Sequence, residues 1–157
     1  MQQLTIEYFH FEQDFMEDSI RCIPMIVRFK LDACGIKLKL KEWSKMTFEE
    51  REQLALLSAE SAAELDVYKT YVQELIYKHT GENATLFSTT HSSHNYWSSI
   101  EFLPTVLEEK LRESKMSISL AQWKDLKVLQ RFALLKLTRP GHENKNFPKA
   151  MKEFGLA

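Results

Sequence analysis

The sequence is short of the residues that build turn-rich β folds. Its 157 residues include only four glycines and four prolines, which argues against a sandwich or barrel with many tight turns. No apolar run approaches the roughly 18 residues that a membrane-spanning helix needs. The N-terminus, Met1–Thr5, lacks the basic and apolar regions of a secretory signal. We therefore expect a cytoplasmic protein that makes no membrane contact.

Cysteine is also scarce, since the chain contains only Cys22 and Cys34. Two cysteines are too few for a disulfide framework. If the chain between them is helical, a rise of about 1.5 Å per residue separates them by roughly 18 Å, which is beyond disulfide reach. We expect two reduced thiols.

The chain has almost no net charge, −1, which argues against a general nucleic-acid binder. The charges are nevertheless segregated, because residues 1–20 carry five acids and no Lys or Arg, whereas residues 21–45 are basic. The cations of the basic segment are Arg21, Arg28, Lys30, Lys37, Lys39, Lys41 and Lys45. Either these segments neutralise one another across the surface, or the basic segment binds an anion or a partner.

An internal repeat is the clearest organising feature. Residues 24–57 align without gaps with residues 104–137, an offset of 80 residues with eight identical pairs in 34 positions. The pairs include Trp43 with Trp123 and Arg51 with Arg131. Because the unit is longer than a solenoid turn, the repeat indicates a duplicated helical subdomain and not an array.

Each copy reads as three short helices. Pro24 and Pro104 can open the first helix, and Gly35 suits its end in the first copy. The spacing of Thr47 with Glu50, and of Ser119 with Gln122, matches that of capping boxes. We interpret Trp43 and Trp123 as core anchors in preference to cofactor-stacking groups, because both lie between apolar residues.

A longer amphipathic helix is expected between the copies, from the capping box Ser61–Glu64 to Gly81. Residues 82–98 lose all periodicity and predict a surface loop. The N-terminal run 6–11 predicts extended chain packed on the helices, and a last short helix is expected near 149–154. Together these features predict an all-α fold: one compact helical domain, residues 1–157, built from two similar three-helix units joined by the longer helix.

No catalytic constellation stands out. His91 and His94 have the spacing of some metal pairs, but two histidines do not complete a zinc site, so we predict no metal and no cofactor. Glycine-rich phosphate loops, nucleophile elbows and metalloprotease motifs are missing. Cys22 beside Arg21 could be a reactive thiol, although a buried structural cysteine is the simpler interpretation.

The segment Arg139–Phe147 concentrates polar side chains in a turn-rich stretch that must lie on the surface, where loops often carry function. A plain C-terminal turn is the alternative. The predicted partner- or anion-binding residues are therefore Arg21, Arg28, Lys37, Lys39, Lys41, Arg139, His142, Glu143, Asn144 and Lys145.

Two stretches of the sequence resemble a known family. The first comprises Phe9-x-Phe11-x-x-Asp14-Phe15 and Arg21-Cys22-Ile23-Pro24-Met25; the second runs from Leu129 to Leu137 and continues into Arg139-Pro140-Gly141-His142-Glu143-Asn144. In this order they resemble the opening and the C-terminal signature of the nitrate reductase-associated protein family. The chain departs from that pattern at residues 58–62, which lack a cysteine, and at residues 82–98.

The resemblance implies a non-enzymatic accessory or maturation factor for cytosolic assimilatory nitrate reductase, with the molybdenum cofactor as a possible passenger in transit. The basic segment and the Arg139–Lys145 loop would then contact cofactor phosphates or an acidic face of the reductase. The alternative is a small ligand-binding protein or thiol-dependent enzyme that uses Cys22 and His142. A helix-turn-helix DNA binder, suggested only by the short repeated helices, fits the net charge poorly.

Overall fold

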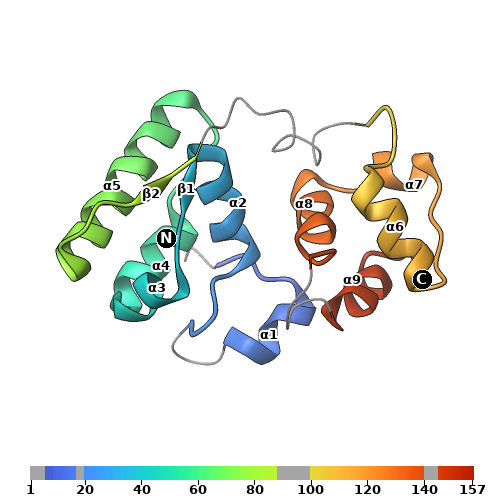
Figure 1. The fold of residues 1–157 in the computed structure, drawn as a ribbon, viewed down its shortest axis with the longest axis horizontal. Helices are drawn as coiled ribbons and strands as arrows, with labels where there is room; N and C mark the ends of the chain where they lie inside the picture. The colour runs from blue at the N-terminus through green and yellow to red at the C-terminus, as the bar shows by residue number, and fades with distance from the viewer. Residues whose placement is uncertain (1–5, 17–19, 88–99, 140–144) are drawn as a thin grey trace, which may run out of the picture. The chain divides into compact units, whose positions relative to one another are not determined.

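The computed structural model describes residues 6–16, 20–87, 100–139 and 145–157. The chain divides into two compact units, residues 1–90 and 91–157, drawn in blue to green and in yellow to red in Figure 1. The described residues are mostly helical, with one two-stranded sheet, so the expectation of a helical fold is confirmed.

The first unit contains five helices and the small sheet in its described residues. In chain order these are α1 (His10–Met16), α2 (Met25–Cys34), β1 (Ile36–Lys37), α3 (Leu40–Lys45), α4 (Phe48–Leu56), α5 (Ala62–Thr80) and β2 (Thr85–Leu86). The strands pair antiparallel, with Ile36 opposite Leu86. The prediction of a surface loop over 82–98 is therefore wrong at Thr85–Leu86, which form a short exposed strand paired with β1; residues 88–98 lie outside the described chain.

The N-terminal prediction needs a second correction, because α1 begins at His10 inside the run expected to be extended. Its residue Glu12 is buried and accepts the Met25 N–H at 2.7 Å and the Phe9 N–H at 3.0 Å. Pro24, at the N-cap of α2, makes no side-chain cap. Glu12 thus satisfies a backbone donor at the start of α2 that this N-cap leaves without a side-chain acceptor.

The other helix boundaries follow local signals. Capping boxes open α4 at Thr47–Glu50 and α5 at Ser61–Glu64. Gly35 ends α2 and Gly81 ends α5, each in the left-handed conformation that glycine adopts without a steric penalty (φ 79° and 73°). The predicted long helix is confirmed as α5, between its expected cap and its expected end.

The core of the first unit lies between α2 and the buried face of α5. Val27 and Leu31 on α2 belong to one apolar cluster with Val72 and Ile76 on α5. Tyr68 is fully buried, and its hydroxyl donates to the Leu54 carbonyl of α4 at 2.7 Å. This bond satisfies the one polar atom of a large buried ring, so α5 holds α4 as well as α2.

The second unit contains α6 (Thr105–Glu113), α7 (Leu120–Asp125), α8 (Val128–Lys136) and α9 (Phe147–Glu153) among its described residues. The helix expected near 149–154 is confirmed as α9, which begins two residues earlier and ends one residue earlier. The large side chains of the second unit that are fully buried are Leu107, Trp123, Phe132, Leu134, Leu137, Phe147 and Met151. Trp43 of the first unit is equally buried, so both tryptophans are core anchors, as the sequence predicts.

None of the helices in the described ranges combines the length and the apolar character needed to cross a membrane.

Candidate functional site

The corner between α3 and α4 is held by Arg51. Its Nε donates to the Trp43 carbonyl at 3.1 Å and its Nη2 to the Ser44 carbonyl at 3.0 Å. The guanidinium also lies over the Trp43 ring, 5.6 Å from the centroid. The indole Nε1 donates to the Ile20 carbonyl at 3.0 Å. These bonds pair carbonyls at the end of a short helix, which is a structural task.

The corner between α7 and α8 is built in the same way. Arg131 Nη1 donates to the Leu126 carbonyl at 2.6 Å, with the Trp123 carbonyl at 3.5 Å and the Lys124 carbonyl at 3.4 Å. Its guanidinium lies 6.0 Å from the Trp123 ring centroid. Burial lowers the pKa of Arg131, yet an arginine stays charged in proteins. Both arginines therefore belong to the scaffold.

Four of the exposed cations of the first unit lie on β1, on α3 or between them. Lys37, Lys39, Lys41 and Lys45 are all exposed, and we call these four residues the lysine row. None of them forms an ion pair with another described residue. Three of them are predicted site residues, and Lys45 extends the set by one turn of α3. An exposed run of unpaired cations attracts anions and acidic surfaces.

The remaining cations of the basic segment differ in their surroundings. Arg21 is exposed just before α2, whereas Arg28 is half-buried and its Nε donates to the Ile23 carbonyl at 3.0 Å. Lys30 is also half-buried, with its Nζ on the carbonyls of Ala55 and Leu57 at 2.8 and 2.6 Å. Burial lowers the pKa of Lys30. Lys30 and the Nε of Arg28 thus bond backbone carbonyls within the fold. The exposed positive charge of the basic segment lies mainly on the lysine row.

The second predicted group is only partly described. Arg139 and Lys145 are exposed and belong to residues 91–157, whereas His142, Glu143 and Asn144 lie outside the described residues. The structure thus places the lysine row and the Arg139–Lys145 segment in different units, and their joint role stays a prediction.

The thiol alternative gains no geometric support from the described residues. Cys22 is half-buried and Cys34 is buried; both are free thiols. Burial raises the pKa of Cys34 to about 11, which keeps it protonated and weakly nucleophilic near neutral pH. The proposed partner of Cys22, His142, lies outside the described residues, as do His91 and His94. Across the described ranges, no three metal-binding side chains cluster.

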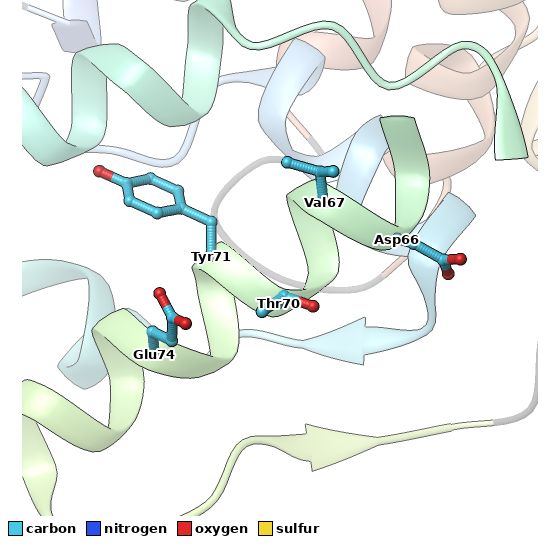
Figure 2. A pocket seen from close by; sticks show the side chains of 5 residues that line it. All are labelled: Asp66, Val67, Thr70, Tyr71 and Glu74. Carbon is cyan, nitrogen blue, oxygen red and sulfur yellow. The ribbon is translucent and has the colours of Figure 1, made fainter. Parts of the chain in front are cut away.

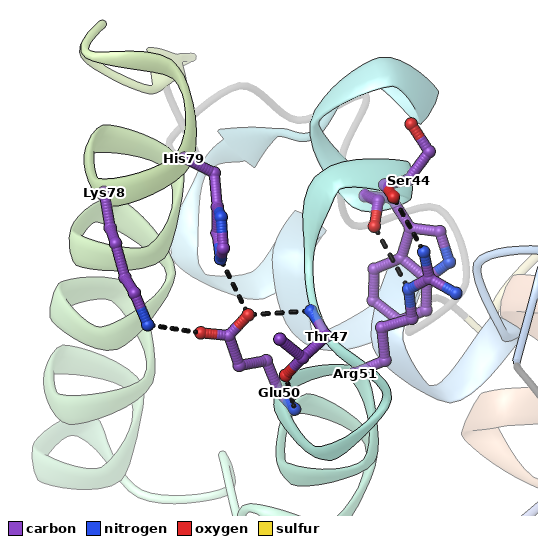
Figure 3. A network of polar contacts seen from close by, with 7 residues as sticks. Ser44, Thr47, Glu50, Arg51, Lys78 and His79 are labelled. Carbon is purple, nitrogen blue, oxygen red and sulfur yellow. Dashed lines mark hydrogen bonds and ion pairs between the residues drawn. The ribbon is translucent and has the colours of Figure 1, made fainter.

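A polar network links α4 to α5 (Figure 3). Glu50 Oε1 accepts the Thr47 N–H at 2.8 Å and lies 2.7 Å from His79 Nε2, while Oε2 lies 3.1 Å from Lys78 Nζ. Burial alone would raise the pKa of Glu50, but these partners outweigh it and lower the pKa to about 2. The capping box of Thr47 and Glu50 can be predicted from the sequence. The contacts of Glu50 with Lys78 and His79 cannot, because they join residues that are 28 and 29 positions apart in the chain.

A shallow groove of about 380 Å³ runs along the outer face of α5, lined by Asp66, Val67, Thr70, Tyr71 and Glu74 (Figure 2). Its two carboxylates give it the opposite charge to the lysine row. Burial, followed by the charge of Glu50, raises the pKa of Tyr71. The groove does not suit an anion, and nothing in the sequence marks it, because its residues occupy the exposed positions of an ordinary amphipathic helix.

Comparison with known proteins finds one family. The family model described as conserved nitrate reductase-associated protein matches residues 8–154, nearly the whole chain. No curated protein and no solved structure matches.

Proposed function

This chain belongs to the conserved nitrate reductase-associated protein family, and we propose that it is a non-catalytic accessory or maturation factor for cytosolic assimilatory nitrate reductase. In this role it binds the reductase and assists its assembly or the insertion of its molybdenum cofactor. The protein itself keeps no resident cofactor.

The observation that carries this proposal is the exposed lysine row on β1 and α3, in a chain whose family is named for nitrate reductase. Four ammonium groups without ion-pair partners among the described residues leave a cationic surface available to another molecule. An acidic face of the reductase and the phosphate of a cofactor in transit are both anionic enough to bind there. Arg139 and Lys145 supply further exposed cations in the second unit.

We further infer that residues 24–57 and 104–137 are two copies of one three-helix unit within a single functional domain. The boundaries support this, since α3 and α7 span 40–45 and 120–125, and α4 and α8 span 48–56 and 128–136. The arginine–tryptophan contacts recur at the same offset. The duplication then explains how so small a chain carries two similar corners.

The test is size-exclusion chromatography with light scattering, in which the purified protein is mixed with cofactor-free nitrate reductase and, separately, with the mature enzyme from the same organism. We expect a co-eluting complex with the cofactor-free form and little or none with the mature form. Absence of a complex with either form at tens of micromolar would contradict the proposal. Equal binding to both would favour a regulatory subunit over a maturation factor.

A further inference from the structure

We propose that the lysine row and Leu40 together form a docking surface for an acidic protein segment that carries an apolar side chain. This inference rests on the proposed function and deepens it, because it selects a protein partner over a phosphate-bearing cofactor for this surface. It is carried by two differences between the α3 and α7 segments, one in charge and one in exposure.

The first difference is in charge. At the 80-residue offset, Lys37, Lys39, Lys41 and Lys45 correspond to Ser117, Ser119, Ala121 and Asp125. The α7 segment nevertheless has the helix boundaries and the arginine–tryptophan corner of the α3 segment. Building this local structure therefore requires none of the four lysines. Their presence in only one segment indicates a task outside the fold.

The acid of the α3 segment does not cancel this charge. Glu42 is 6% exposed, and its Oε1 accepts the Lys39 N–H at 2.8 Å. Its carboxylate is thus used inside the segment, while the four ammonium groups are exposed. The outward charge of residues 37–45 is consequently cationic throughout, and an acidic partner complements it.

The second difference is in exposure. Leu40 lies between Lys39 and Lys41 in the chain and is 63% exposed, whereas the corresponding Leu120 is half-buried. Phe48, at the start of α4, is a second exposed apolar side chain, at 40%. One exposed leucine alone means little. An exposed apolar side chain with unpaired cations on both sides of it in the chain, however, matches the composition of protein interfaces, in which an apolar centre is bordered by charges.

This arrangement separates the two anionic ligands considered above. A phosphate group gains its binding energy from the ammonium groups and gains nothing from Leu40. An acidic protein segment with an apolar side chain uses both. Nucleic acid is the poorer match, because the chain has a net charge of −1 and the outer face of α5 carries Asp66 and Glu74.

The test uses the full chain and cofactor-free nitrate reductase from the same organism, with affinity measured by biolayer interferometry at several salt concentrations. The charge variant K37S/K39S/K41A installs the residues of the α7 segment. The apolar variant is Leu40→Ser. The matched control K115G/K124S/K127T removes three cations from the second unit and installs the residues of the first.

We expect the charge variant to weaken binding by about tenfold or more, most strongly at low salt. Leu40→Ser should weaken it by about fivefold and leave the salt dependence unchanged. The control should change the affinity by less than about twofold. Loss in the charge variant with no loss in Leu40→Ser would overturn the inference in favour of simple anion binding. If the wild type binds the reductase and both the charge variant and Leu40→Ser bind it equally well, the docking surface is overturned and the proposed function stands.

A second probe is independent of the reductase. Two acidic heptapeptides, one with a central leucine and one with serine in its place, are titrated into the protein and followed by amide chemical shifts. We expect the leucine peptide to bind more tightly, with shifts confined to residues 37–48. If the reductase does not bind but the leucine peptide does, the proposed function fails and the docking surface stands. Equal binding of the two peptides overturns the inference.

Discussion

The α3–α4 corner of the first unit and the α7–α8 corner of the second are alike inside and different outside. Inside, an arginine pairs the carbonyls of the preceding turn and covers a buried tryptophan in both. The chain enters each segment through a left-handed residue, Gly35 with φ 79° and Lys115 with φ 57°. Outside, the lysine row is present in one and replaced in the other. The comparison separates the residues that the structure of the corner requires from the exposed residues that it does not require.

The third residue of α4 and of α8 differs in the same sense. Glu50 and Gln130 both accept a backbone N–H at their own helix start, from Thr47 and Lys127 at 2.8 Å. Only Glu50 also reaches His79 and Lys78 on α5. Both corners therefore need the helix cap, which either side chain provides. The charge of Glu50 has a separate role, which is to hold α5 against α4.

The largest effect is expected where the two corners agree. Trp43→Ala and Trp123→Ala should each lower the free energy of unfolding by about 3–5 kcal/mol, because each empties a fully buried site. Urea denaturation measures this loss, and Tyr77→Ala, on a ring that is 61% exposed, serves as the control with a change within about 0.5 kcal/mol. Losses below about 1 kcal/mol would contradict the role of the tryptophans as core anchors.

The same two variants test the single-domain proposal. If the chain unfolds as one cooperative domain, calorimetry shows one transition, and either substitution lowers its midpoint. Two separate transitions, each sensitive to only one tryptophan, would mean that the units are independent domains.

The next effect should distinguish the two arginines. Arg131 is 6% exposed whereas Arg51 is half-buried, so Arg131→Ala leaves carbonyls unpaired that water reaches less easily. We expect losses of about 2–3 kcal/mol for Arg131→Ala and about 1–2 kcal/mol for Arg51→Ala in urea denaturation. Equal losses would show that the difference in burial between the corners has no energetic consequence.

A smaller effect, and a pH dependence, are expected at Glu50. Its pKa in the folded protein is about 2, against an ordinary 4.5, so its contribution to stability is present above pH 4.5 and is lost as the pH falls toward 2. Glu50→Gln keeps the cap, as Gln130 does, and should lower the free energy of unfolding at pH 7 by about 1–2 kcal/mol.

The control for this prediction is the reverse change, Gln130→Glu, because Gln130 accepts the Lys127 N–H but contacts no histidine or lysine side chain among the described residues. We expect no gain in stability there. Thermal melts between pH 2 and 7 should show a flatter profile for Glu50→Gln than for the wild type. If the melting temperature of Glu50→Gln depends on pH as that of the wild type does, Glu50 makes no contribution to the loss of stability in acid.

The smallest effect on stability is expected at the lysine row. K37S/K39S/K41A should change the free energy of unfolding by no more than about 0.5 kcal/mol, because the α7 segment folds with those residues. Chemical denaturation beside the binding assay verifies this. A loss above about 2 kcal/mol would mean that the lysines support the fold, and the loss of binding could then not be assigned to docking.

Sequence patterns predict those features that neighbouring residues determine. The capping boxes of α4 and α5, the glycine ends and the buried tryptophans follow from spacing alone. The β1–β2 pair does not, since two exposed residues at 85–86 give no apolar alternation to detect. Helix α1 is missed for a similar reason: its tie to α2 runs through Glu12, thirteen residues from Met25.

The candidate site shows the same limit. The sequence identifies the basic segment but cannot tell Lys30, which turns inward to the carbonyls of Ala55 and Leu57, from Lys37, which stays exposed. That distinction depends on where α4 ends in space. The Glu50–His79 contact likewise joins residues 29 positions apart, and only the packing of α5 brings them together.

The compactness of the arginine–tryptophan corner also has a kinetic consequence. Arg51 and Trp43 are eight residues apart, and a loop of that size closes in roughly 10–100 ns. The β1–β2 pair, by contrast, must bring Ile36 to Leu86 across the whole of α3, α4 and α5. We expect both corners to form early, by local encounters, and the small sheet to close late, so that the arginine contact with each tryptophan precedes the burial of that tryptophan by the rest of its unit.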